Sequence, residues 1–144
     1  MLRLKSGGLR GLAELAAGVI ATVVEPAPAD VITWVPPDLW RTIHRGYHPA
    51  QMLADGLGRR WGIPARPLLA AALVRRPQRG LDPAARRRNV REAFRAAGVL
   101  RGEAVILVDD VLTTGATLSA CGSVLRRAGA ATVSAVTLAR VVRL

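Results

Sequence analysis

Residues 105–118 read VILVDDVLTTGATL. Four apolar residues run into the adjacent carboxylates Asp109 and Asp110, and a turn of small hydroxyl residues around Gly115 follows. Continuous apolar runs of this length are typical of strands in a parallel sheet that is covered on both faces. Ligands bind beyond the carboxyl ends of such strands, so the acidic pair and the turn mark a candidate binding site.

Predicted strands and helices alternate along the rest of the chain. Short apolar runs bounded by Pro, Gly or polar residues predict strands at 31–35, 68–74, 104–108 and 132–141. Amphipathic segments predict helices at 9–24, 49–61, 83–98 and 117–128. This order is typical of an α/β fold with a doubly wound, mostly parallel sheet and helices on both faces. We expect a single domain over residues 1–144, of which residues 1–30 form an N-terminal helical segment.

Composition narrows the class of protein. Hydrophobic residues make up 51% of the 144 residues, which is typical of a globular domain rather than a disordered chain. No apolar run reaches the roughly 18 residues that span a bilayer, and no clean cleavage site follows the basic start, so we expect a cytoplasmic protein. The only cysteine, Cys121, excludes an internal disulfide within this sequence, and we expect it to be a small apolar residue on a helix.

The charge is strongly positive. The formal net charge is +11, and nearly all of the basic residues are arginine. Residues 75–101 hold nine arginines against Asp82 and Glu92, a local excess of +7. A charge of this size predicts attraction to phosphates, whether those of nucleotides or those of a nucleic acid.

The turn after the acidic pair has the chemistry of a phosphate site. Gly115 allows a tight turn, and the exposed amides, the threonine hydroxyls and the start of the following helix can cradle a phosphate. The carboxylates would repel that phosphate unless the ligand offers them hydroxyl groups or a metal. A ribose 5-phosphate satisfies both halves of the site. Its phosphate would contact the turn and its 2′ and 3′ hydroxyls would donate to Asp109 and Asp110.

Two other interpretations of this stretch are weaker. An apolar strand that ends in Asp-Asp also occurs in P-loop ATPases, but these need an upstream G-x-x-x-x-G-K-[ST] motif. The only lysine, Lys5, is not in that context, so we exclude this class. The other interpretation is a capped helix start, where Asp110 and Thr117 only satisfy backbone groups. A cap needs one such residue, whereas this stretch has two aspartates and three threonines.

The segment VILVDDVLTTGAT resembles the phosphoribosyl pyrophosphate (PRPP) motif of type I phosphoribosyltransferases. The resemblance implies that Asp109 and Asp110 are catalytic-site residues that hold the ribose diol. It implies that the 5-phosphate is bound by Thr113, Thr114, Gly115, Ala116 and Thr117. It also implies that Mg²⁺ enters with PRPP, without a direct protein ligand, and that pyrophosphate is displaced at C1 by an acceptor that the sequence does not identify.

Two further segments resemble ComF-type competence proteins within that family. They are RGYHPAQMLADGL, from Arg45, and QRGLDPAARRRNVREAF, from Gln78. Tyr47, His48 and Pro49 replace the usual Phe, Asn and Gln of the first segment. The four-cysteine zinc ribbon that usually precedes the domain in that family is not in this sequence. The resemblance implies a role in DNA uptake, with single-stranded DNA bound along the arginines of 75–101.

Several other residues are candidates by their place in the sequence. The turn after the first strand corresponds to the pyrophosphate side of type I enzymes, and its candidates are Pro37, Asp38, Arg41 and Arg45. The basic segment corresponds to a mobile loop or a nucleic-acid surface, and its candidates are Arg76, Gln78, Arg86, Arg88 and Asn89. Trp40 and Tyr47 are the best candidates for stacking on bases, whereas we expect Trp34 and Trp61 in the core. We expect surface or packing roles for His44 and His48.

Three functions remain open from the sequence. The first is a phosphoribosyltransferase with an unknown acceptor, the second is an accessory protein of DNA uptake that binds single-stranded DNA, and the third is a non-catalytic sensor of PRPP or a nucleotide. A homodimer is also left open.

Overall fold

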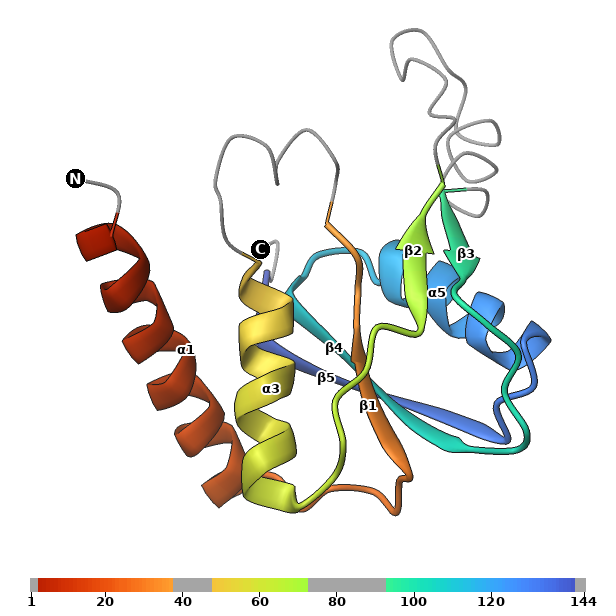
Figure 1. Ribbon diagram of the computed structural model, residues 1–144, viewed down its shortest axis with the longest axis horizontal. Helices are drawn as coiled ribbons and strands as arrows, with labels where there is room; N and C mark the ends of the chain where they lie inside the picture. The colour runs from red at the N-terminus through yellow and green to blue at the C-terminus, as the bar shows by residue number, and fades with distance from the viewer. Residues whose placement is uncertain (1–2, 38–47, 73–92, 142–144) are drawn as a thin grey trace, which may run out of the picture.

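The computed structural model describes residues 3–37, 48–72 and 93–141. Its elements are α1 (Arg3–Val23), β1 (Val31–Trp34), α3 (Pro49–Trp61), β2 (Leu69–Ala71), β3 (Phe94–Ala96), β4 (Ala104–Leu112), α5 (Ala116–Arg127) and β5 (Thr132–Arg140). Three strands form a parallel sheet in the order β1-β4-β5, and β2 and β3 form a separate antiparallel pair (Figure 1). The central strand, β4, is therefore the one that carries the acidic pair.

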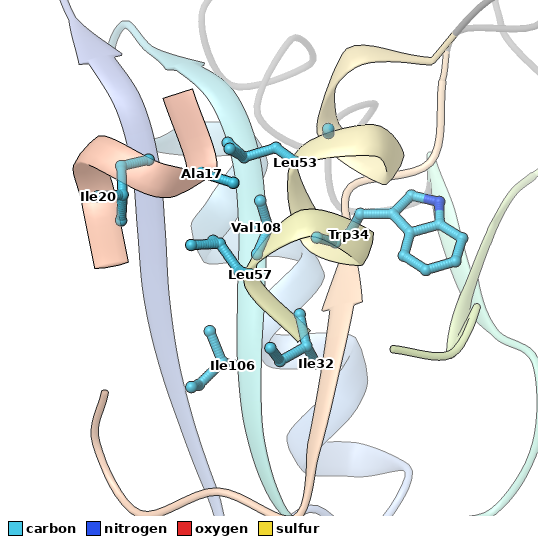
Figure 2. Packing of buried hydrophobic residues seen from close by; sticks show 10 residues of the cluster. Ala17, Ile20, Ile32, Trp34, Leu53, Leu57, Ile106 and Val108 are labelled. Carbon is cyan, nitrogen blue, oxygen red and sulfur yellow. The ribbon is translucent and has the colours of Figure 1, made fainter. Parts of the chain in front are cut away.

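Strand β1 and residues 105–108 of β4 are buried on both faces of the sheet, whereas β5 is partly or fully exposed along its length. On one face, Ile32 of β1 and Ile106 of β4 pack against Leu53 and Leu57 of α3, with α1 beyond them (Figure 2). On the other face, the alternate residues of the same strands pack against Cys121, Val124 and Leu125 of α5. Successive side chains of a strand point to opposite faces, which is why one apolar run serves both layers. The predicted α/β fold with helices on both faces is confirmed, as is the position of Cys121 on a helix, where its side chain is buried.

Helices α1 and α3 pack side by side through small residues (Figure 1). A Cβ atom added at Gly56 of α3 would lie 2.8 Å from the Cβ of Ala17 of α1, so the helices approach more closely than an alanine at 56 would allow. Ala17 is fully buried, whereas Leu12, Leu15, Val19 and Val23 on the outer side of α1 are exposed. The described helices include none that is long and apolar enough to cross a membrane.

The chain after α3 extends the sheet beyond β1. Helix α3 ends at Gly62, which has the left-handed φ of 68° that favours glycine. The backbone N–H of Ile32 then donates to Pro64 O and the N–H of Arg66 donates to Ile32 O, each at 2.9 Å. The buried hydroxyl of Thr33 accepts from the N–H of Leu68 at 3.1 Å. This segment therefore covers the edge of β1.

Three predicted elements differ from the structure. The strand predicted at 68–74 is only Leu69–Ala71, and it pairs with β3 rather than joining the parallel sheet. The helix predicted at 83–98 is wrong at its end, because residues 94–96 form β3; the part before residue 93 lies outside the described residues. Strand β4 extends four residues past Val108, so the acidic pair lies within the strand rather than after it.

Candidate functional site

The two aspartates lie on opposite faces of the sheet. Strand β4 continues through them to Leu112, so the alternation of its side chains continues as well. Asp109 is on the face of Leu107, which packs toward α5, and Asp110 is on the face of Val108, which packs toward α3. The carboxyl end of β4 therefore carries Asp109 on the α5 side and Asp110 on the α3 side, with the two carboxylates close enough to interact with each other.

Backbone groups hold both carboxylates in place. The N–H of Asp110 donates to Asp109 Oδ1 at 2.9 Å, and the N–H of Val111 donates to Asp110 Oδ1 at 3.0 Å. Each of these bonds uses Oδ1, which leaves Oδ2 of each carboxylate for another donor. Both side chains are only partly buried, so a ligand can reach them.

Asp109 has a perturbed acidity. The pKa of its carboxyl is raised to about 6, mainly by burial and also by hydrogen bonding with the Asp110 side chain and by the Asp110 charge, while the hydrogen bond from the Asp110 N–H lowers it. The same burial, together with the Asp109 charge, raises the pKa of the Cys121 thiol to about 12, so this thiol is unreactive near neutral pH. An ionised Asp109 therefore lacks the solvation of an ordinary carboxylate, and hydroxyl donors from a ligand would stabilise it.

The turn between β4 and α5 leaves amides available. Gly115 is the residue before the first helical turn and has a left-handed φ of 76°. Gly115 has no side chain to cap α5, and the first turn of this helix holds no acidic residue. The N–H of Ala116 donates to Thr114 Oγ1 at 3.4 Å, which leaves the amides of Gly115 and Thr117 for a ligand. The capped-helix interpretation is not supported, because neither Asp110 nor Thr117 caps this helix, and the start of α5 keeps the partial positive charge that binds anions.

The start of α3 contributes a residue whose role the sequence did not predict. His48 is the N-cap of α3, and its Nδ1 accepts from the N–H of Gln51 at 3.2 Å. Its Nε2 is buried and has no hydrogen-bond partner among the described residues. Burial lowers the pKa of this imidazole, and the nearby charge of Asp110 partly opposes that shift. The one signal in the sequence was a polar residue directly before Pro49 at a helix start.

The structure places only part of the predicted site. The acidic pair and residues 113–117 meet at the carboxyl end of β4, and Pro37 follows β1. The remaining candidates lie outside the described residues: Asp38, Arg41, Arg45, Arg76, Gln78, Arg86, Arg88 and Asn89, together with Trp40, His44 and Tyr47. Trp34 is buried as predicted and Trp61 is partly buried. Within the three described ranges, no three His, Cys, Asp or Glu side chains form a group that could hold a metal ion.

Comparison with known sequences identifies similar proteins. Residues 44–142 match the family model described as phosphoribosyl transferase domain. The chain is 35% identical over 108 residues to the DNA utilization protein YhgH of Escherichia coli O6:H1, which covers 71% of this chain and 46% of that protein. It is 36% identical over 116 residues to competence protein F of Haemophilus influenzae, which covers 77% of this chain and 50% of that protein. The chain thus spans about half the length of these curated relatives.

Comparison with solved structures supports the fold. The glutamine PRPP amidotransferase of B. subtilis, solved with ADP and GMP, has a TM-score of 0.62 and 26% identity, over 88% of this chain and 26% of that one. The adenine phosphoribosyltransferase of Thermoanaerobacter pseudethanolicus has a TM-score of 0.57 and 20% identity, over 88% of this chain and 66% of that one. The fold predicted from the sequence is the fold of these proteins.

Proposed function

Because the chain belongs to the phosphoribosyl transferase domain family, we propose that it binds PRPP, or another ribose 5-phosphate, at the carboxyl end of β4. One observation carries the proposal: the uncapped start of α5, behind the left-handed Gly115, lies directly after a pair of carboxylates. The first feature suits a phosphate and the second suits a diol. A ribose 5-phosphate carries both groups on one small molecule.

Two kinds of group would hold the ligand: hydrogen-bond donors at its phosphate and hydrogen-bond acceptors at its ribose hydroxyls. The amides of Gly115 and Thr117 and the threonine hydroxyls would donate to the 5-phosphate, which has only acceptors to offer. The Oδ2 atoms of Asp109 and Asp110 would accept from the ribose hydroxyls. These hydroxyls would replace part of the solvation that Asp109 has lost by burial.

We propose displacement of pyrophosphate at C1 of PRPP by an acceptor as the reaction. Such a reaction needs no protein nucleophile, so the residues of this chain would act by positioning the ribose and by countering its charges. Carboxylate and phosphate oxygens are the ligands that Mg²⁺ prefers. The donor set would fit Mg²⁺ held mainly by PRPP itself, to which Asp109 and Asp110 could add carboxylate oxygens, and the ion would stabilise the leaving pyrophosphate as a Lewis acid.

Calorimetric titration with PRPP and Mg²⁺ tests the proposal. Asp109→Asn combined with Asp110→Asn removes two charge-assisted acceptors, so PRPP affinity should fall about tenfold or more. Asp55→Asn combined with Glu103→Gln is the matched control, because it changes the net charge equally at positions away from the carboxyl end of β4. Circular dichroism of all three proteins checks the fold. Equal PRPP affinity of the wild type and the variant with both Asp109→Asn and Asp110→Asn would overturn the assignment of these carboxylates to the ribose diol.

A second candidate function is binding of single-stranded DNA. Two observations favour it: the names of the curated relatives, DNA utilization protein and competence protein F, and the nine arginines of residues 75–101. Arginines in such number would neutralise backbone phosphates of any sequence. A non-catalytic sensor of PRPP is the third candidate, and an assay for pyrophosphate release in the presence of PRPP and candidate bases distinguishes it from the enzyme.

A further inference from the structure

The two edges of the parallel sheet differ. Beyond β1, the segment at 64–66 exchanges backbone hydrogen bonds with Ile32 and covers that edge. Strand β5 forms the other edge, and within residues 3–37, 48–72 and 93–141 no segment pairs with its outer side. Its nine residues therefore leave a row of backbone N–H and C=O groups open to another strand.

Strand β5 lacks the features with which proteins usually block an open edge. Such edges carry charged side chains, proline or a bulge, or they are very short. Residues 132–139 read TVSAVTLA, without a charge or a proline, in a chain in which 22% of the residues are charged. The pairing with β4 keeps one register from Thr132 to Arg140, so the strand has no bulge. Its outer edge is thus suited to accept a further strand.

Helix α1 lies over this edge, on the same side of the sheet as α3. Val136 of β5 packs against the cluster that contains Ala17 and Ile20 of α1, and these two side chains lie in front of β5 in Figure 2. The contact of α1 with α3 is made through Ala17 and Glu14. Helix α1 therefore has α3 on one side and the sheet beneath it.

The side of α1 that faces away from α3 is apolar and exposed. Four large side chains recur there every three or four residues, and each is more than half exposed: Leu12, Leu15, Val19 and Val23. At 3.6 residues per turn, this α1 stripe lies opposite to Ala17, so it faces outward beyond β5. A contiguous exposed apolar surface beside an open strand is typical of a protein–protein interface.

We propose that β5 and the α1 stripe form the interface of a symmetric dimer, in which β5 pairs antiparallel with β5 of a second copy. A two-fold axis perpendicular to the sheet makes β5 meet itself in this direction. The two three-stranded sheets then form one continuous sheet of six strands. The same axis keeps both copies of α1 on one face of that sheet, so one symmetry operation covers the open edge and the α1 stripe together.

The charges of the chain favour a second copy over a partner of another kind. Two molecules with a net charge of +11 repel each other in general. Neither the α1 stripe nor residues 132–139 contain a charged residue, so the surfaces that meet in the dimer add no repulsion. Antiparallel pairing also places the two copies of Arg140 at opposite ends of the paired strands. An acidic partner, by contrast, would find no countercharge on these surfaces.

Charge substitutions in the α1 stripe test the dimer. Leu15→Lys combined with Val19→Lys gives one variant, and Leu15→Glu combined with Val19→Glu gives the other. Both positions are exposed, so circular dichroism should be unchanged. A two-fold axis brings like charges together in each variant, so the dissociation constant should rise about tenfold or more, whereas an equimolar mixture of the two variants should form the dimer again. Val99→Lys, on the connection between β3 and β4, is the control, because Val99 is exposed and apolar as well.

Sedimentation equilibrium from about 1 µM to about 100 µM measures these association constants. Hydrogen exchange then examines β5 itself, because its outward amides should be protected in the wild-type dimer and should exchange faster in the glutamate variant. A wild type that is monomeric over this range overturns the proposal. A dimer that neither charged variant weakens, a mixture that does not associate, or outward β5 amides that exchange freely in the dimer would each overturn it as well.

Discussion

The guanidinium of Arg60 on α3 contacts Glu14 on α1 at two points: Nη1 is 2.9 Å from Glu14 Oε2, and Nη2 is 3.1 Å from the Glu14 carbonyl oxygen. Nη1 is also 3.0 Å from the Gly56 carbonyl oxygen, and Arg59 makes a second ion pair with the same carboxylate. One exposed cluster of charges therefore lies beside the close contact of Ala17 and Gly56. We expect these two kinds of contact to contribute differently to the free energy of unfolding.

The ion pairs should contribute little to stability. The side chains of Arg60 and Glu14 are 34% and 43% exposed, so solvent screens their attraction. We expect Glu14→Gln to lower the free energy of unfolding by less than about 1 kcal/mol, and by less still at high salt. Urea unfolding at low and high salt measures both effects. A large loss that salt does not change would show that Glu14 acts through packing instead.

The glycine contact should contribute much more. Gly56→Ala places a methyl group 2.8 Å from the Cβ of Ala17, so the helices must separate. We expect a loss of about 1–3 kcal/mol from overpacking, although alanine favours a helix over glycine by about 1 kcal/mol.

Gly11→Ala is the matched control for this substitution. Gly11 lies in the same pair of helices, but a Cβ there meets nothing within 4 Å, so this variant should gain stability by about 0.5–1 kcal/mol. Urea midpoints of both variants against the wild type give the comparison. A gain at both positions would mean that α1 shifts easily on α3.

The acidity of Asp109 predicts how stability changes with pH. Its folded pKa of about 6 is above the ordinary 3.8, so the folded protein holds this proton more tightly than the unfolded chain. Its contribution to stability is therefore present at low pH and is lost as the pH rises through about 6.

Asp109→Asn should remove this dependence. The variant, in which the amide mimics the neutral acid, should match the wild type only at pH values below the ordinary 3.8 and be more stable than the wild type at pH 7 without ligand. Glu103→Gln is a control of opposite sign, because hydrogen bonding to the Arg101 N–H lowers the pKa of Glu103. Denaturant unfolding from about pH 3 to pH 8 measures the three proteins. A wild type that is more stable than Asp109→Asn at pH 7 would contradict the assignment.

The turn before α5 predicts a position that is intolerant of side chains. Gly115 has a φ of 76°, which costs other residues about 1–2 kcal/mol, so Gly115→Ala should destabilise the protein by that amount and weaken PRPP binding. Gly122→Ala, on the same helix, is the control, because its Cβ would be in ordinary contact with Val133 at 3.8 Å. Thermal melts and PRPP titrations of both variants test this, and equal behaviour would remove the special role of the turn.

The DNA hypothesis predicts a salt-dependent affinity. Four to six arginines on a single strand, at about −0.7 per phosphate, should give a slope of roughly −3 to −4 for log K against log salt. Replacing Arg86, Arg87, Arg88 and Arg91 with alanine should flatten this slope for every oligonucleotide sequence.

The control variant removes the same charge elsewhere. Arg10, Arg66, Arg126 and Arg127 are exposed, and their replacement with alanine should weaken binding much less if residues 75–101 carry the contact. Fluorescence anisotropy at several salt concentrations measures the slopes. If the wild type does not bind DNA at low salt, the DNA hypothesis fails and the nucleotide hypotheses remain.

The parallel sheet could be predicted from the sequence because its signals are local. The runs at β1, β4 and β5 are apolar and bounded by turn residues, and α5 follows a glycine turn. Strands β2 and β3 have three residues each, too few for a period to be visible, and they exist because they pair across the chain. For Phe94–Ala96, that pairing overrides the helical propensity of a segment rich in alanine and arginine.

That the acidic pair and the Gly115 turn lie at the carboxyl end of one strand could be predicted for the same reason, since these residues are adjacent in sequence. The role of His48 could not, because it depends on which nitrogen receives the Gln51 amide and on the burial of the other one. His48 and Asp110 are 62 positions apart in the sequence, and only the packing of α3 on β4 brings them near each other.

The placement of Asp109 and Asp110 on opposite faces of β4 has an evolutionary consequence. Substitutions between Ala104 and Val108 that keep an apolar side chain would leave each carboxylate in its layer. Insertion or deletion of a single residue there would place the side chains that follow it in β4, including both carboxylates, on the opposite face of the sheet. Homologous genes should therefore vary in length in the connections on either side of this strand, while the number of codons between its first residue and the acidic pair stays constant.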